Sequence, residues 1–206
     1  MAQVLANYEE QLANAQMPAG KKKVLTTALK LFASNGFHAT TTAKIAKQAG
    51  VSEGTIYKYF ASKQDLLTQL LQPILEDIKD NLFSDLDEQH DLRTMVDFIV
   101  DDRIQFIEAN FDFIRVIFHG VLTGQLLDNQ TLESFLTGNN GVLTRLQDMQ
   151  KAFPQINQQL TSPQMAQIFV GPIYAYVFQN KLLGLPASDN DMALIKKQIL
   201  NNLTMK

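Results

Sequence analysis

The stretch TTAKIAKQAGVSEGTIYKYF, residues 41–60, decides the fold of the N-terminal part of this chain. The threonines at its start and Ser52 in its middle carry hydroxyl groups of the kind that cap helix N-termini. Gly50 lies between these caps, and glycine accepts the positive φ that a tight turn requires. The stretch therefore predicts a short helix that ends at Ala49, a turn, and a second helix of about seven residues after Ser52, together a helix-turn-helix.

The side chains of these two helices divide into an inner and an outer face. Ala46 is small, which lets the second helix cross closely over the first. The inner face, which locks the helices together, consists of Ile45, Val51, Ile56 and Phe60. The outer face, where a DNA major groove would lie, consists of Glu53, Gly54, Tyr57 and Lys58. Plain packing of two helices within an α-helical bundle is the alternative.

Helical periodicity runs through the whole sequence without sustained period-2 alternation, so we predict an all-α fold. Two of the helices belong to residues 41–60. The other expected helices cover about 3–15, 24–34, 63–83, 91–109, 111–123, 130–152, 162–184 and 189–204. Nine helices thus follow an additional one in the N-terminal extension. Pro73 predicts a kink in its helix, and Gly138 to Gly141 predict a split in theirs.

Charge is distributed unevenly along the chain. Residues 17–66 hold eight lysines and two acids, a net charge of +6, whereas the rest of the chain carries −9. A basic segment on an acidic body is expected where one end of a protein meets a polyanion, and chance clustering on a solvated face is the alternative. We divide the chain into an N-terminal extension (1–16), a helix-turn-helix domain (17–66) and a second helical domain (67–206).

Composition limits the class of protein. The 206 residues suffice for one domain or two small ones, and the apolar content of 46% argues against long disorder. The absence of cysteine excludes disulfides, thiolate zinc sites and a cysteine nucleophile. No apolar run is long enough to cross a membrane, and a first segment with Glu9 and Glu10 does not resemble a signal peptide. We expect a cytoplasmic protein without membrane contact.

Nothing in the sequence supports catalysis. His38, His90 and His119 are far apart, and none has a potential metal ligand at helical spacing. Glycine-rich phosphate loops and nucleophile-elbow motifs are absent. Adjacent carboxylates such as Asp101 and Asp102 diverge on a helix. We therefore predict no catalytic residue, no metal site and no cofactor.

The sequence from Val24 to Leu67 resembles the DNA-binding domain of the TetR/AcrR family of bacterial transcriptional regulators. The resemblance rests on Asn35-Gly36-Phe37, Ile45-Ala46, Ala49-Gly50-Val51-Ser52, Gly54-Thr55-Ile56-Tyr57, Tyr59-Phe60 and Ser62-Lys63. It covers roughly a fifth of the chain, and the helices beyond residue 70 match the family by number and length only.

The resemblance implies DNA contacts at individual positions. Thr42 matches a phosphate-contacting position at a helix N-terminus. Ala43 stands where relatives sometimes carry a base-reading arginine, so its contact would be apolar. Glu53 can accept a hydrogen bond from cytosine N4, and Gly54 permits close approach to the bases. The remaining predicted contacts match DNA-backbone positions or lie beside them: Lys44, Thr55, Tyr57, Lys58, Tyr59 and Lys63.

Lys21 begins a run of three lysines whose charges oppose the helix dipole. The family's first helix often meets a phosphate, so we add Lys21 to the predicted DNA contacts. The alternative for Lys21 is that the three lysines are simply solvated. For Tyr57, the alternative to a contact with the DNA backbone is a half-buried structural role.

The resemblance also implies that the C-terminal helices form a homodimer and bind a small molecule. Residues 165–185 are apolar nearly all round, as expected of a helix buried on every side. The predicted dimer contacts are Phe169, Ile173, Val177, Ile195 and Ile199. The predicted pocket for a hydrophobic or aromatic effector consists of Phe98, Asp102, Arg115, Phe118, His119, Met149, Tyr174 and Phe178, each of which can instead be core filling or a structural ion-pair partner.

These features predict a homodimeric repressor that an effector releases from a palindromic operator. The alternatives are an architectural DNA-binding dimer without an effector and an interaction module whose helix-turn-helix is vestigial. The identity of the effector, the operator sequence and the sign of regulation do not follow from the sequence.

Overall fold

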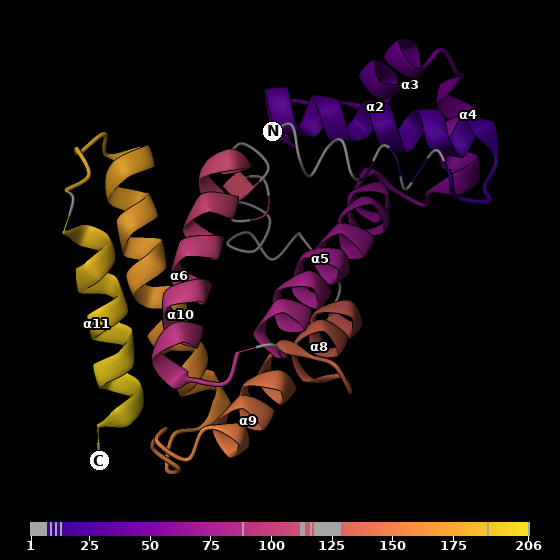
Figure 1. The fold of residues 1–206 in the computed structure, drawn as a ribbon. Helices are drawn as coiled ribbons and strands as arrows, with labels where there is room; N and C mark the ends of the chain where they lie inside the picture. The colour runs from indigo at the N-terminus through magenta and orange to yellow at the C-terminus, as the bar shows by residue number, and fades with distance from the viewer. Residues whose placement is uncertain are drawn as a thin grey trace. The chain divides into compact units, whose positions relative to one another are not determined.

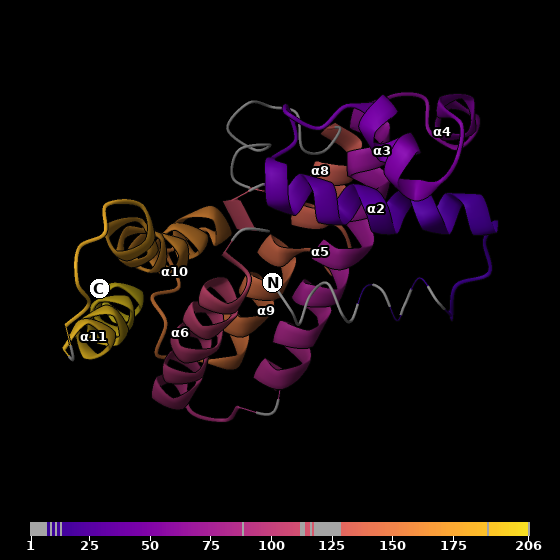
Figure 2. The ribbon, with the colours of Figure 1, turned by 90° about the horizontal axis from the view of Figure 1, so that it is seen from above.

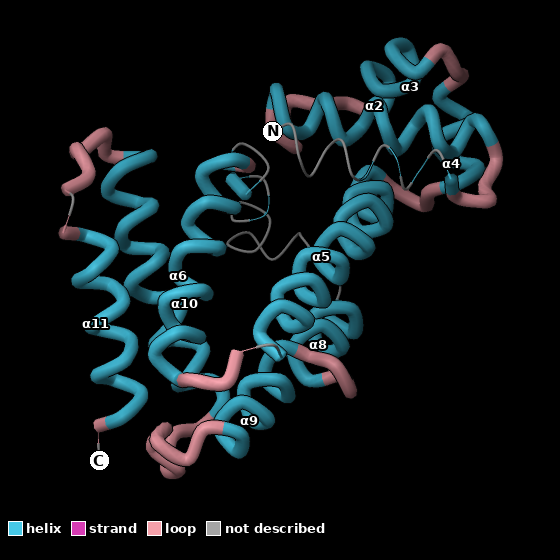
Figure 3. The backbone as a smooth tube through the Cα atoms, in the orientation of Figure 1, coloured by secondary structure: helices cyan, strands magenta, loops and turns pink. Residues whose placement is uncertain are grey.

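A computed structural model of the chain describes residues 8, 10, 12, 14–87, 89–111, 114, 115, 117, 129–188 and 190–205. Every regular element within these residues is a helix, which confirms the predicted all-α class (Figure 3). The chain divides into two compact units, residues 1–77 with 109–131 and residues 78–108 with 132–206. Their boundary lies at Asp77 inside a long helix, α5 (Lys63–Asp87), further along the chain than the expected boundary at residue 66.

The first unit contains α2 (Ala19–Asn35), α3 (Thr42–Ala49), α4 (Glu53–Tyr59) and the first part of α5. Both α3 and α4 pack against α2 (Figure 1). The apolar core of this unit includes Leu25, Leu29, Phe32, Ile45, Ile56, Phe60, Leu66, Leu67, Leu70 and Leu71, all of them buried.

The N-terminal extension contributes buried residues as well. Tyr8 and Leu12, one helical turn apart within the helix expected at about 3–15, are both helical and buried. Burial raises the pKa of the Tyr8 hydroxyl to about 12, because the charged phenolate is poorly solvated there.

The start of α5 resembles a capping box but differs from it in one contact. The Asp65 backbone N–H donates to Ser62 Oγ over 3.0 Å, as expected of such a cap. The Asp65 carboxylate, however, accepts a hydrogen bond from the Ala61 backbone N–H over 2.7 Å, one residue before the cap. The helix then continues through Pro73 as one element.

The second unit contains the last part of α5, α6 (Leu92–Ala109), α8 (Asn129–Thr137), α9 (Val142–Ala152), α10 (Ser162–Val177) and α11 (Asp191–Thr204). A π-helical turn, Phe178–Leu182, extends α10. The break between α8 and α9 at Gly138 to Gly141 confirms the expected split. The predicted helix over 111–123 lies largely outside the described residues.

Helix α10 packs against α9 and α11 (Figures 1 and 2). Their shared core with α6 includes Val96, Val100, Leu146, Ile156, Met165, Ile199 and Leu203. Two ion pairs tie α6 to the C-terminal elements: Lys196 Nζ lies 2.7 Å from Asp101 Oδ2, and Lys181 Nζ lies 3.6 Å from Glu108 Oε1. No helix among the described residues is long and apolar enough to span a membrane.

Candidate DNA-binding interface

The helix-turn-helix is built by the caps and the turn that the sequence predicts. Thr41 Oγ1 accepts the Lys44 backbone N–H over 3.1 Å, and Ser52 Oγ accepts the Thr55 backbone N–H over 3.2 Å. Gly50 ends α3 in the left-handed conformation, with φ of +68°. These contacts start α3 and α4 at fixed residues and turn the chain between them.

Burial separates the two faces of the helix pair as expected. Ile45 and Ile56 are fully buried and Phe60 is nearly so, while Val51 is half-buried. The opposite face exposes Ala43, Lys44, Glu53, Gly54 and Lys58 together with Tyr57, whose exposure is 53%. The exposed face presents cationic, acidic and hydroxyl groups on two adjacent helices, a chemistry suited to phosphates and base edges.

Three of the predicted contact residues touch one another. Thr42 Oγ1 donates to Glu53 Oε1 over 2.5 Å, and the Tyr57 hydroxyl lies 3.4 Å from the same Thr42 oxygen. Thr42 is the first residue of α3 and Glu53 is the first residue of α4. A side-chain hydrogen bond thus joins the N-terminal ends of the two helices.

Thr55 and Tyr59 lie on the side of α4 that faces α2. A methyl group built on Gly20 would meet Tyr59 Cε2 at 3.5 Å and Thr55 Cγ2 at 3.6 Å, so both side chains pass close to the start of α2. Both are half-buried. Lys58 Nζ lies 5.7 Å from the centre of the Tyr59 ring, a cation–π contact at the edge of the exposed face.

The Lys63 side chain makes hydrogen bonds and a cation–π contact within the first unit. Its ammonium donates to the backbone carbonyls of Phe37 and Thr40 over 2.9 and 3.0 Å and lies 4.2 Å from the centre of the Phe37 ring. Partial burial lowers the pKa of Lys63 below its usual value. The side chain ties the start of α5 to the α2–α3 connection, a structural role that the sequence did not reveal.

The Lys21 side chain likewise makes a hydrogen bond and a cation–π contact within the first unit. Its ammonium donates to Gln69 Oε1 over 3.0 Å and lies 5.4 Å from the Phe60 ring centre. Gln69 Nε2 in turn donates to Asp65 Oδ1 over 2.9 Å, and Asp65 also binds the Ala61 backbone N–H. A chain of hydrogen bonds therefore runs from Lys21 at the start of α2 to the Ala61 backbone, just after the end of α4.

The predicted effector residues do not line one common cavity. Asp102 is paired with its neighbour Arg103, and Tyr174 stacks on Phe178 with ring centres 6.2 Å apart on an exposed face. Phe98 is half-buried and Arg115 is exposed. Phe118 and His119 lie outside the described residues. Among the predicted residues that the structure describes, Met149 alone lines the apolar cavity of the second unit.

That cavity has a volume of about 460 Å³ and lies among the end of α5, α6, α9 and α10. Its apolar lining includes Leu86, Met95, Ile99, Leu146, Phe153 and Phe169, and its polar lining consists of Gln89, His90, Arg145 and Asp148. Arg145 lies across the Phe83 ring, with its Cζ 5.2 Å from the ring centre. The sequence offered only apolar stripes at these positions, which fill a core and line a cavity equally well.

The predicted dimer contacts are side chains of the subunit's own core. Phe169, Ile173, Val177, Ile195 and Ile199 are all buried within the single chain. They point inward because α10 and α11 pack on each other and on the rest of the second unit. The dimer contacts therefore stay a prediction, and the large apolar side chains that α10, its π-helical extension and α11 leave exposed are Val170, Tyr174, Phe178, Leu182 and Leu194.

The fold and the exposed helix pair define a helix-turn-helix domain of the kind found in DNA-binding proteins. A family model for the tetR family of bacterial regulatory proteins matches residues 24–70. This match assigns residues 24–70 to the DNA-binding domain of that family.

Relatives with curated names agree with this assignment. The chain is 26% identical over 127 residues to the fatty acid metabolism regulator protein of Bacillus subtilis, a match that covers 59% of this chain and 65% of the relative. It is 29% identical over 126 residues to the nucleoid occlusion factor SlmA of Aliivibrio fischeri, covering 60% of this chain and 62% of the relative. The matches thus span less than two thirds of these relatives, which are named as regulatory factors rather than as enzymes.

Solved structures share the fold over nearly the whole chain. The transcriptional regulator FadR from Bacillus subtilis in complex with stearoyl-CoA has a TM-score of 0.64 at 21% identity and covers 89% of this chain and 97% of that one. A TetR family transcription regulator from Marinobacter aquaeolei has a TM-score of 0.71 at 17% identity, covering 91% and 97%.

Proposed function

We propose that this protein is a transcriptional repressor that binds a palindromic operator as a homodimer and is released by a small hydrophobic effector. The exposed face of α3 and α4 carries the proposal, because it offers hydroxyl, cationic and small residues on a helix pair of the size that enters a major groove. Such a protein acts in the cytoplasm, where bacterial DNA lies.

The base and phosphate contacts belong to the exposed part of the predicted set. Thr42, Ala43, Lys44, Glu53, Gly54, Tyr57 and Lys58 face outward or lie at the edge of the exposed face. Thr55 and Tyr59 reach the DNA backbone from the α2 side of α4. Lys21 and Lys63 act on the DNA indirectly, since they fix α2, α4 and α5 through hydrogen bonds within the unit.

Selection from random duplex DNA at about 0.15 M salt tests this proposal, because that ionic strength suppresses the non-specific electrostatic term. Enrichment of an inverted repeat is the expected result. Failure to enrich any sequence, with protein shown to be folded, would contradict sequence-specific binding.

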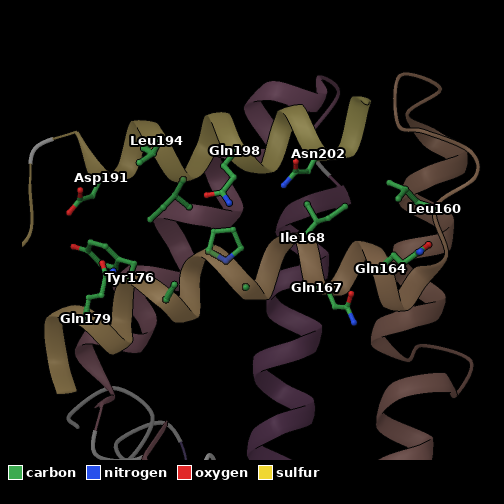
Figure 4. A pocket seen from close by; sticks show the side chains of 14 residues that line it. Leu160, Gln164, Gln167, Ile168, Tyr176, Gln179, Asp191, Leu194, Gln198 and Asn202 are labelled. Atoms are coloured by element: carbon green, nitrogen blue, oxygen red, sulfur yellow. The ribbon is translucent and has the colours of Figure 1, made fainter. Parts of the chain in front are cut away.

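The dimer interface is proposed on the outer face of α10 and α11. A groove of about 660 Å³ runs between these helices, and Gln198 and Asn202 point from α11 toward α10 (Figure 4). Leu194 and Gln167 also line it. Gly171 and Ala175 also line the groove, and such small side chains let a partner helix approach closely. Next to the groove, the Tyr174–Phe178 pair adds exposed aromatic surface. An apolar patch with a polar rim is typical of a protein–protein interface.

The effector site is proposed in the cavity among α5, α6, α9 and α10. Its volume is within the range of small-molecule pockets, and its lining combines apolar walls with a few polar groups. The B. subtilis structure with a similar fold holds stearoyl-CoA, so an acyl thioester is the first compound to test. Its apolar chain would enter the cavity, and Arg145 and His90 would meet its polar end.

A thermal-shift titration with stearoyl-CoA, with coenzyme A alone as the control, tests the effector proposal. We expect stabilisation by stearoyl-CoA only, and release of the selected operator at the same concentrations. Ala166→Phe, which fills the cavity from α10, should abolish both responses and leave operator binding intact. Binding without any change in operator affinity would exclude the cavity as a regulatory site for this compound.

An architectural DNA-binding dimer without an effector remains the second candidate. The relative named as a nucleoid occlusion factor favours it. Operator enrichment together with an unchanged operator affinity across a panel of acyl, aromatic and other hydrophobic compounds would support this candidate over the first.

A further inference from the structure

The contact between Glu53 and Thr42 bears on how DNA is chosen. Thr42 is proposed to donate its hydroxyl hydrogen to a DNA phosphate, yet in the structure that hydrogen points to Glu53 Oε1 over 2.5 Å. A hydroxyl group has one hydrogen to donate, so the carboxylate and a phosphate oxygen exclude each other as acceptors. The Tyr57 hydroxyl, 3.4 Å from the Thr42 oxygen, borders the same place.

Glu53 is an acidic residue within a strongly basic segment of the chain. Residues 17–66 carry eight lysines and only two acids, Glu53 and Asp65. Asp65 serves the fold, because its two oxygens accept hydrogen bonds from Ala61 and Gln69. Glu53 is exposed on the outer face and bonds to a predicted phosphate contact instead. A carboxylate there repels every phosphate that approaches, whatever the DNA sequence.

We infer that Glu53 is a specificity-determining residue that competes with the DNA phosphate for Thr42 and yields only to DNA that offers it an amino group. To free Thr42, the Glu53 side chain must turn from α3 toward the base edges of the major groove. There it meets a donor only at cytosine N4 or adenine N6, whereas guanine and thymine present acceptors. The cost of displacing the carboxylate is thus offset on a matching sequence and remains on all others. The inference rests on the proposed function.

Affinities of the Glu53→Gln variant for the selected operator and for random duplex test the inference. The substitution removes the charge and keeps the shape. We expect affinity for random duplex to rise about tenfold and affinity for the operator to rise less or fall. The ratio of operator affinity to random-duplex affinity should then drop on the order of tenfold, which is the discrimination that one base-reading contact provides. Repeated DNA selection with the variant should also relax the cytosine or adenine preference at one position in each half-site.

Two further variants separate competition at Thr42 from a general charge effect. Glu133→Gln makes the same charge change at an exposed position of α8, outside the helix-turn-helix, and should leave the ratio unchanged. In a Thr42→Val background the hydroxyl is gone. Glu53→Gln should therefore raise affinity for random duplex by less than the factor of about ten expected when Thr42 is present.

Equal gains on operator and random duplex, or the same gain with and without the Thr42 hydroxyl, would overturn the inference. Its failure is distinct from failure of the proposed function. If the wild-type chain enriched no operator, the proposed function would fall, and the random-duplex measurements in the two Thr42 backgrounds would still decide whether Glu53 competes for Thr42.

Discussion

Two helix pairs of this protein, α3 with α4 and α10 with α11, present opposite kinds of surface. The outer face of α3 and α4 carries lysines, hydroxyl groups and one acid, and Tyr57 is its exposed large apolar side chain. The outer face of α10 and α11 carries amide side chains together with Val170, Tyr174, Phe178 and Leu194. The first chemistry suits a hydrated polyanion, and the second suits a protein surface that buries apolar area.

The two surfaces separate charged from apolar chemistry within one chain. The first unit keeps most of its large apolar residues in its own core and leaves its charged residues exposed. The α10–α11 pair keeps apolar residues on both sides of α10, and an exposed apolar face of this kind is typical of a surface that a partner covers. Predictions that change one surface and leave the other intact test this separation.

The largest effect is expected from Leu194→Arg on α11. Leu194 is 63% exposed and lines the groove between α10 and α11. A charge there should dissociate the proposed dimer, and loss of the second half-site contact should weaken operator binding on the order of a hundredfold or more. Sedimentation and operator titration measure the two effects.

Leu132→Arg on α8 is the matched control, because it introduces the same charge at an exposed leucine outside the α10–α11 face. It should leave both the oligomeric state and operator binding unchanged. A dimeric Leu194→Arg variant would show that the dimer forms elsewhere.

A smaller effect on stability should distinguish two lysines of the first unit. Lys63→Ala removes donors from two backbone carbonyls and should lower the free energy of unfolding by about 1–3 kcal/mol. Lys58→Ala, on the exposed face, should leave stability within about 0.5 kcal/mol. It should instead weaken binding to all DNA sequences and reduce the salt dependence by about one unit of slope. Chemical unfolding and salt titrations check both results, and an unchanged stability of Lys63→Ala would contradict its structural role.

Two glycines of the helix-turn-helix should respond in opposite directions. Gly50→Ala places a side chain at φ of +68° and should cost about 1–2 kcal/mol, although no atom within 4 Å would clash with it. Gly54→Ala lies within α4, where the added methyl group meets only Ser52 Oγ at 3.8 Å, and should stabilise the protein by about 0.5–1 kcal/mol. Thermal unfolding measures both. If Gly54 lets the helix approach the bases, the stabilised Gly54→Ala variant will nevertheless bind the operator more weakly.

The smallest effect concerns pH and comes from a carboxylate cap in the second unit. α3 and α4 begin at hydroxyl caps, whereas the Asp91 carboxylate before α6 accepts the Thr94 backbone N–H over 2.9 Å. Hydrogen bonds from Thr94 lower the pKa of Asp91 below its usual value of 3.8. The ionised carboxylate therefore contributes stability that is present above pH 3.8 and is lost as the pH falls through the lower, folded-state pKa.

Asp91→Asn keeps a capping oxygen and removes the titration. Its free energy of unfolding should depend less steeply on pH than that of the wild type below pH 3.8, with little difference near neutrality. Identical acid unfolding curves for the two proteins would show that this cap does not contribute to the pH dependence.

The sequence by itself determined the helix-turn-helix down to single residues. Caps, a left-handed glycine and the spacing of Ile45, Ile56 and Phe60 are local features, and each depends on residues within a few positions of one another. The division of α3 and α4 into a buried and an exposed face followed from the same short-range pattern. The all-α class and the break at Gly138 to Gly141 were predicted for the same reason.

Only the tertiary structure decided the contacts between residues far apart in the chain. Lys21 and Lys63 look like surface cations in the sequence, and their hydrogen bonds to Gln69, Phe37 and Thr40 appear only when α2 and α5 meet. Likewise, a helix that is apolar all round gives no sign of which side is covered by its own chain. The burial of Phe169 and Ile173 and the exposure of Tyr174 and Phe178 depend on where α9 and α11 pack, which no local pattern encodes.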